Sequence, residues 1–137
     1  MKIISKSENL NKKMVISTLW IFTALNYLYC DVMGLMNPIM LSQYLAGDIH
    51  GMKIDESFLI KAAVVIEIPI AMVFLSRILV YKVNRWANVI AGSIMTVAMV
   101  VTMFMGSGWP TMYYLFFGTI EIFTTSFIVW YAWVWNE

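Results

Sequence analysis

The sequence contains few charged residues: Asp, Glu, Lys and Arg make up 12% of its 137 residues, about half the share of roughly 25% in an average soluble domain. Apolar residues of the set AVILMFWYC account for 61%, and the mean hydropathy is +0.78. A chain this short cannot bury so much apolar surface away from water. The composition therefore excludes an ordinary soluble domain and predicts a protein whose solvent is lipid.

Cysteine and histidine are also scarce, with one residue of each. A single cysteine excludes a disulfide framework and a cysteine-based zinc site, and a single histidine excludes a multi-histidine metal site. The formal net charge of +1 gives no sign of the clustered Lys and Arg that neutralise phosphates. We therefore expect no metal, no other cofactor and no nucleic-acid partner.

Long apolar runs are abundant. A membrane-spanning helix needs about 20 mostly apolar residues, and the stretches that qualify are about 14–33, 58–80, 86–105 and 112–135. No alternation of polar and apolar residues indicates a β-barrel. The predicted fold class is all-α: one polytopic membrane domain over residues 1–137, built as a four-transmembrane-helix bundle. The first run is too long for a cleaved secretory signal and lacks an Ala-x-Ala site, so we expect it in the mature protein.

Basic residues set the expected orientation. They concentrate in the tail at residues 1–13 and around a predicted turn at 81–85, whereas the loop at 36–56 has only Lys53 against three acidic residues, and the loop at 106–111 has no charge. By the positive-inside rule, both termini and the 81–85 turn are cytoplasmic, and the other two loops face outward.

The outer loop at 36–56 contains the run PIMLSQYLA, from Pro38 to Ala46, which ends at Gly47. We expect a short interfacial helix lying on the outer membrane surface. Tryptophans are typical interfacial anchors, and most of the six lie near predicted span ends. They are Trp20, Trp86, Trp109, Trp130, Trp133 and Trp135.

Four ionisable residues fall inside the predicted spans, where a charged side chain at the centre costs about 3 kcal/mol on insertion scales. They are Asp31, Lys61, Glu67 and Glu121. With the orientation above, the two glutamates lie deep in their spans, and Asp31 and Lys61 lie nearer the outer surface. These positions predict one polar pocket that opens outward.

Helical spacing adds neutral polar residues to this pocket, because residues three and four apart share a face. Asn26 and Tyr27 follow the same stripe as Asp31, and Thr124 shares a stripe with Glu121. Pro69 removes a backbone donor and crowds the preceding turn, so we expect a kink beside Glu67. The predicted ligand- or ion-binding residues are Asn26, Tyr27, Asp31, Lys61, Glu67, Glu121 and Thr124.

Each of these features also has a structural interpretation. Glu67 and Glu121 can be protonated groups that hydrogen-bond between helices, and Asp31 with Lys61 can be an ion pair at the outer interface. We favour a functional role for the glutamates, because two mid-membrane carboxyl groups are a high cost for helix packing alone. Cys30 fits a packing residue better than a nucleophile, since no histidine lies in the spans to activate it.

Other polar residues fit topology better than chemistry. Arg77, Asn84 and Arg85 are typical of topology determinants that contact lipid headgroups, and His50 is expected to be solvated in the outer loop. In the third span, Ala87 with Ala91, and Gly92 with Thr96, place small residues four apart. That spacing permits close helix packing within the bundle or in a homodimer, and we favour the dimer.

Three sequence regions, which together cover most of the chain, carry a family resemblance: LWIFTALNYLYCDVMGLMNP, EIPIAMVFLSRIL with NRWANVIAG, and YYLFFGTIEIFTTSFIVWYAWVW. Together they resemble a family of small bacterial four-span membrane proteins of unknown function, and the layout is similar to that of DoxX-type membrane proteins. The resemblance implies a four-span fold in the bacterial inner membrane. It implies no reaction.

Three functions remain open from the sequence. The first is binding or transport of a cation, a proton or a small amphiphilic molecule at the glutamates, with Asp31 at the mouth of the pocket. The second is a membrane enzyme in which Glu67 and Glu121 act as an acid and base pair on a quinone- or isoprenoid-like substrate. The third is an accessory subunit of a larger complex. No catalytic motif is recognised, which favours a protein that is not an enzyme.

Overall fold

The computed structural model describes residues 2–49, 51–105 and 110–136. Side chains are described from residue 7 onward, with the exception of residue 105. His50 and the predicted loop at 106–109, which includes Trp109, lie outside the described residues. The elements in chain order are α1 (Lys2–Met36), α2 (Pro38–Ala46), β1 (Asp48–Ile49), β2 (Met52–Lys53), α3 (Glu56–Ile78), α4 (Tyr81–Met105) and α5 (Met112–Trp133).

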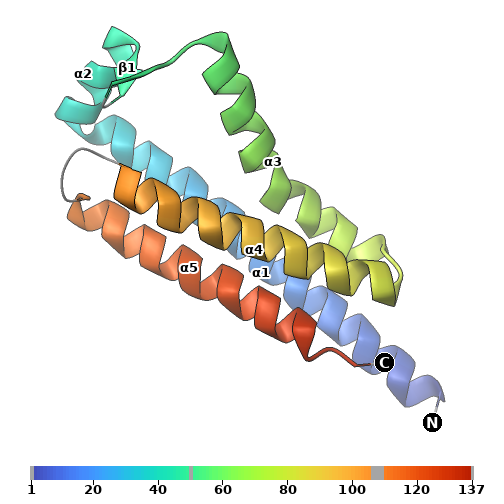
Figure 1. Cartoon of the computed structure of the whole chain (residues 1–137). Coiled ribbons are helices and arrows are strands. Elements are labelled where there is room, and N and C mark those ends of the chain that lie inside the picture. The colour runs from blue at the N-terminus through green and yellow to red at the C-terminus, as the bar shows by residue number, and fades with distance from the viewer. Residues whose placement is uncertain (1, 50, 106–109, 137) are drawn as a thin grey trace.

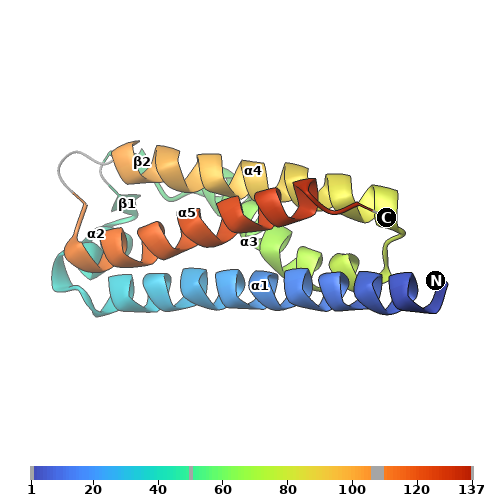
Figure 2. The same cartoon turned by 90° about the horizontal axis from the view of Figure 1, so that it is seen from below.

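Four helices, α1, α3, α4 and α5, are long and apolar enough to span a membrane, which confirms the predicted all-α four-helix membrane bundle. Figure 1 shows both termini at one end of the bundle, together with the α3–α4 junction. We call this the terminal end. The opposite end, called the loop end, carries α2 and the β1–β2 hairpin. Contacts give the order α1, α5, α4, α3 around the bundle, and Figure 2 shows α5 between α1 and α4.

Two helix starts differ from the predicted spans. α1 begins at Lys2 rather than near residue 14, and α4 begins at Tyr81, so the predicted turn at 81–85 is the first turn of a helix. The chain instead breaks at Leu79, whose ψ of 146° is extended. The run YKVNR is polar but contains no helix breaker, and polarity marks where lipid ends rather than where a helix must end.

The outer connection contains the predicted short helix, α2. Asn37 caps it by accepting hydrogen bonds from the backbone N–H groups of Ile39 and Met40, and Pro38 occupies the first turn. Gly47 ends the helix with a φ of 70°, which glycine adopts without strain. The hairpin that follows, in which Asp48 pairs with Lys53, is too short for its strands to show in the sequence pattern.

The α4–α5 pair is the most extensively packed, because a glycine lets the two helices approach closely. A Cβ atom on Gly92 would lie 2.7 Å from Val129 Cγ2 and 3.2 Å from the Thr125 carbonyl oxygen. The Gly92 and Thr96 stripe therefore packs inside the bundle, and it no longer supports a dimer contact through α4. Trp20 and Trp135 belong to the buried core, so these two tryptophans are not the interfacial anchors predicted.

α3 is packed along only part of its length. Its buried residues are Pro69, Met72 and Ser76, all in the second half. Figure 1 shows the first half standing away from α1 and α4, while the second half lies against them. The helix is continuous through Pro69, and a kink at that residue stays a prediction.

Candidate functional site

A group of polar side chains from α1 and α5 meets in the half of the bundle nearer the loop end. Glu121 points inward, because it belongs to the buried face of α5 that repeats every three or four residues, from Gly118 through Glu121 to Thr125. From α1, Asn26 and Cys30 are buried and Tyr27 is half-buried. We call these residues, with Asp31 and Tyr114, the loop-half cluster.

The titratable members of this cluster, which are Tyr27, Cys30, Asp31, Tyr114 and Glu121, lie within electrostatic range of one another. The Tyr27 hydroxyl interacts with Glu121, Tyr114, Cys30 and Asp31, and the two carboxyl groups of Glu121 and Asp31 interact as well. Tyr114 is held against α4, because its hydroxyl donates to Thr102 Oγ1 at 3.0 Å. The Glu121 carboxyl group of α5 therefore lies close enough to Tyr27 and Asp31 of α1 for their charges to interact.

The polar atoms at the centre of this cluster lack hydrogen-bond partners among the described residues. Glu121 is 1% exposed and Asn26 is 8% exposed. Both carboxyl oxygens of Glu121, the Asn26 Nδ2 and the Tyr27 hydroxyl are all buried and unpaired. Buried polar groups in proteins are nearly always hydrogen-bonded, and an unpaired buried charge is costly. A proton, a cation or a hydrogen-bonding ligand at these atoms would therefore stabilise the cluster.

Asp31 links the cluster to the loop end. Its side chain is exposed, and one turn further along α1 a Cβ atom on Gly34 would lie 3.6 Å from the Tyr113 hydroxyl and 3.9 Å from the Tyr44 hydroxyl. Burial raises the pKa of Tyr44, and the negative charge of Asp31 raises it further, followed by a contribution from Tyr113. Three elements, α1, α2 and α5, thus bring titratable groups together where the cluster approaches the surface.

The structure brings together four of the seven predicted site residues, Asn26, Tyr27, Asp31 and Glu121. Thr124 is half-buried, and its hydroxyl donates to the Ile120 carbonyl oxygen of its own helix. The threonine that shares the inward face is Thr125, whose Oγ1 lies 2.7 Å from Thr96 Oγ1 of α4. Both threonines satisfy helical spacing from Glu121, and only packing against α4 distinguishes them.

Glu67 and Lys61 lie apart from this cluster. Lys61 lies on the loop-end half of α3 and Glu67 at its centre. Both side chains are exposed, and neither forms a hydrogen bond or ion pair within the described part of the chain. The predicted pair of Asp31 with Lys61 is therefore not formed there. Among the described residues, the two carboxyl groups of the predicted shared pocket lie in different surroundings, because that of Glu67 is exposed and that of Glu121 is buried.

A second polar region, which the sequence reasoning missed, lies nearer the terminal end. Trp20 Nε1 donates to Asn88 Oδ1 at 2.6 Å, and the Ser76 hydroxyl donates to the same oxygen at 3.1 Å. Asn88 Nδ2 donates to Asn84 Oδ1 at 2.6 Å, and Asn84 Nδ2 donates to the Ser76 carbonyl oxygen at 2.6 Å. We call these four fully buried residues the terminal-half network.

This network corrects the interpretation of Asn84, which is 0% exposed and does not contact lipid headgroups. The signal in the sequence was the spacing of Asn84 and Asn88, which places two amides on one face of a helix. Arg77 and Arg85 also form intramolecular hydrogen bonds, to Ser17 Oγ at 3.0 Å and to the Trp133 carbonyl oxygen at 2.8 Å.

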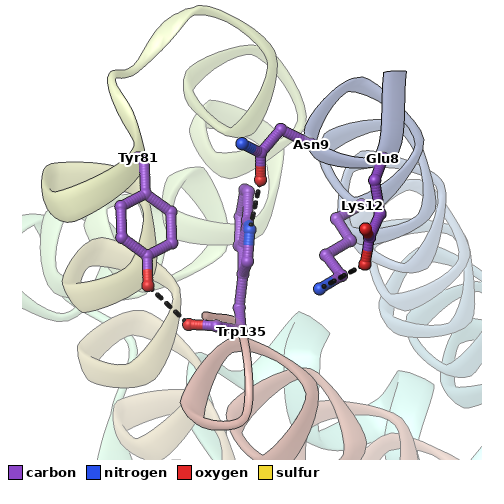
Figure 3. Close-up of polar contacts among 5 residues, drawn as sticks. All are labelled: Glu8, Asn9, Lys12, Tyr81 and Trp135. Atoms are coloured by element: carbon purple, nitrogen blue, oxygen red, sulfur yellow. Dashed lines mark hydrogen bonds and ion pairs between the residues drawn. The ribbon is translucent and has the colours of Figure 1, made fainter. Parts of the chain in front are cut away.

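The two chain ends join beside this network. Trp135 Nε1 donates to Asn9 Oδ1 at 2.8 Å, and the Tyr81 hydroxyl donates to the Trp135 carbonyl oxygen at 2.6 Å (Figure 3). The same view shows Lys12 paired with Glu8 at 3.2 Å on α1. Trp135 therefore connects α1 to the start of α4 while packing its ring against Tyr81.

Comparison with known proteins gives a family for the chain and no reaction. No curated protein and no solved structure matches the chain. A family model described as a family of unknown function, DUF6326, matches residues 1–137. The chain is therefore a four-span membrane protein of the DUF6326 family.

Proposed function

We propose that the loop-half cluster binds a proton or a small cation at Glu121. This binding is the central step of the protein's function, which is either ligand binding or transport across the membrane. The observation that carries this proposal is a carboxyl group that is 1% exposed and has both oxygens unpaired among the described residues. An ionised carboxylate in such surroundings needs a compensating positive charge. A proton on Glu121, or a cation beside it, supplies that charge.

The neighbouring groups suit this role. The Tyr27 hydroxyl can donate to or accept from the ligand, and a cation can draw on the oxygens of Tyr27, Glu121 and the Asn26 side chain. Asp31, exposed and within electrostatic range of Glu121, attracts positive charge toward the cluster. A small amphiphilic molecule with a positively charged group satisfies the same demand and is the alternative ligand.

The proposal includes an address and an orientation. We propose that the terminal end lies in the cytoplasm, which the basic residues of the tail and of the α3–α4 junction support. We also propose a bacterial inner membrane and a DoxX-like layout, in line with the resemblance of the sequence to small four-span membrane proteins. The loop-half cluster then opens toward the outside, so Glu121 exchanges its ligand with the external solution.

The test uses the full chain in liposomes and compares Glu121→Gln with the matched variant Glu67→Gln. Infrared difference spectra across a pH step report the carbonyl stretch of a protonated carboxyl group, and a pH-sensitive dye inside the liposomes reports proton flux. We expect Glu121→Gln to remove the largest carboxyl signal and any flux, and Glu67→Gln to leave the Glu121 band in place.

Two further arms separate the ligands. If sodium or potassium shifts the Glu121 band at constant pH, the site binds a cation as well as a proton. An amphiphilic cation that shifts the band while sodium and potassium do not would assign the site to that alternative. An unchanged spectrum and unchanged flux in Glu121→Gln would reject the proposal.

A further inference from the structure

The most anomalous side chain outside the loop-half cluster is Glu67. α3 runs from Glu56 to Ile78 and has 23 residues, so Glu67 is its central residue and lies near the middle of the membrane. Its side chain is exposed. Within the described residues it forms no hydrogen bond or ion pair. A carboxyl group facing acyl chains at this depth is expensive, and such groups in membrane proteins normally face a partner or a cavity.

Helical geometry places Glu67 on the side of α3 that faces away from the bundle. The residues of α3 that are buried are Pro69, Met72 and Ser76, and at 3.6 residues per turn Glu67 lies nearly opposite them. Ala63 and Ala71 are one turn away on either side, on the same stripe as Glu67. Ala63 and Glu67 are exposed and Ala71 is half-buried, so the stripe presents a carboxyl group flanked by two small residues on the side away from the bundle.

α3 is also the least covered of the four spans. In its most apolar window 11% of the residues are buried, against 28% to 33% in the other three helices. Small residues four apart allow two membrane helices to approach closely, and polar side chains between them then hydrogen-bond across the contact. The stripe thus has the composition of a helix–helix interface, and among the described residues no helix covers its Ala63 and Glu67 positions.

We propose that this stripe, Ala63 with Glu67 and Ala71, is the interface of a two-fold symmetric dimer, and that the two Glu67 carboxyl groups hydrogen-bond to each other across it. A two-fold axis along the membrane normal places the same residue of both copies at the same depth. A carboxyl group that carries its proton donates one hydrogen bond and accepts others, so it can pair with a copy of itself. The basic residues give every copy one orientation, which keeps the two α3 helices parallel, as this axis requires.

The second copy fits better than an unrelated partner. Another membrane protein would need a hydrogen-bond donor or a positive charge at the same depth, whereas an identical copy supplies the complement automatically. Lys61 is exposed but lies on a different side of α3 from Glu67. A second copy turned upside down, which would bring Lys61 toward Glu67, conflicts with both the charge bias and these directions.

Cysteine cross-linking in membranes tests the interface. In a Cys30→Ala background, Ala63→Cys is compared with Val97→Cys, because each residue lies four positions from the centre of its helix toward the loop end and each is exposed. We expect mild oxidation to give a disulfide-linked dimer as the main species for Ala63→Cys and little for Val97→Cys. Equal cross-linking of the two would overturn the proposal.

Subunit counting by single-molecule photobleaching in liposomes tests the role of the carboxyl group. Glu67→Leu should lower the association constant about tenfold, the size expected for the two hydrogen bonds of a symmetric carboxyl pair in a membrane. Glu67→Gln should retain the dimer, since an amide also donates and accepts. A monomeric wild-type chain, or a dimer insensitive to Glu67→Leu, would overturn the proposal. Cross-linking of Ala63→Cys only to a different membrane protein would assign the stripe to that partner instead.

Discussion

Two polar regions of the same bundle differ in how their hydrogen-bonding groups are used. In the terminal-half network, Trp20 and Ser76 both donate to Asn88, and Asn88 donates to Asn84. In the loop-half cluster, equally buried atoms of Asn26 and Glu121 have no partner among the described residues. Burial alone therefore does not distinguish structural from functional polar groups in a membrane. Satisfied groups fix helix packing, and unsatisfied ones remain available to a ligand.

The helix α1 contains both kinds. Trp20 belongs to the satisfied network, and Asn26, less than two turns later, belongs to the unsatisfied cluster.

The largest expected effect is in the terminal-half network. Asn88→Leu removes the acceptor for Trp20 and Ser76 and the donor to Asn84, leaving buried groups unpaired. We expect the free energy of unfolding to fall by about 2 to 3 kcal/mol. Unfolding in mixed detergent, followed by circular dichroism, measures the change. Asn11→Leu, at an exposed position of α1, is the matched control and should change stability little.

We expect Glu121→Leu to raise the free energy of unfolding, whereas Asn88→Leu lowers it. Replacing an unpaired buried carboxyl group by an apolar side chain of similar size removes an uncompensated polar group, so stability should rise by about 1 kcal/mol. The same variant should lose proton or cation binding in the infrared assay. A large loss of stability would show that Glu121 makes structural hydrogen bonds, and the contrast between the two regions would fail.

The register of α5 is tested by a pair of threonine variants. Thr125→Val removes the hydrogen bond to Thr96 Oγ1, which should cost about 0.6 kcal/mol. Thr124→Val loses only a bond to the carbonyl of its own helix, so we expect a smaller change. The same unfolding assay measures both, and a larger effect at Thr124 would place the other face of α5 against α4.

The smallest expected effect is on the pH dependence of stability, through Tyr44 at the loop end. Because the pKa of Tyr44 is raised in the folded chain, its stabilising contribution is complete below the ordinary tyrosine pKa of about 10 and declines as the pH rises above it. The melting temperature should therefore fall more steeply at alkaline pH in the wild type than in Tyr44→Phe. Identical pH profiles would mean that neither burial nor the charge of Asp31 raises the pKa of Tyr44 in the folded chain.

Much of the fold follows from the sequence, because bilayer thickness imposes a span length that apolar runs reveal directly. The short helix α2 was also predictable, since Asn37 and Pro38 are typical residues at the start of a helix and Gly47 is typical of its end. The start of α4 was not, because a helix can continue beyond the apolar region into polar residues such as those at 81–85.

The candidate site was predictable only in part. Asn26, Tyr27, Asp31 and Glu121 were identified because ionisable residues and polar stripes are rare in apolar spans. Glu67 satisfied the same criteria, yet it faces outward, because the direction of a side chain depends on which neighbours a helix packs against. The spacing of residues within one helix does not show which neighbours that helix packs against. The sequence likewise gives no sign that the first half of α3 stands away from α1 and α4.

The contact between Trp135 and Asn9 joins residues separated by 126 positions. During synthesis the four helices enter the membrane one after another, and the earlier ones can associate as they arrive. The hydrogen bonds of Trp135 to Asn9 and from Tyr81 cannot form until residue 135 has left the ribosome. The terminal end of the bundle is therefore completed only after α5 has been synthesised, and until then the side chains of Asn9 and Tyr81 lack these two partners.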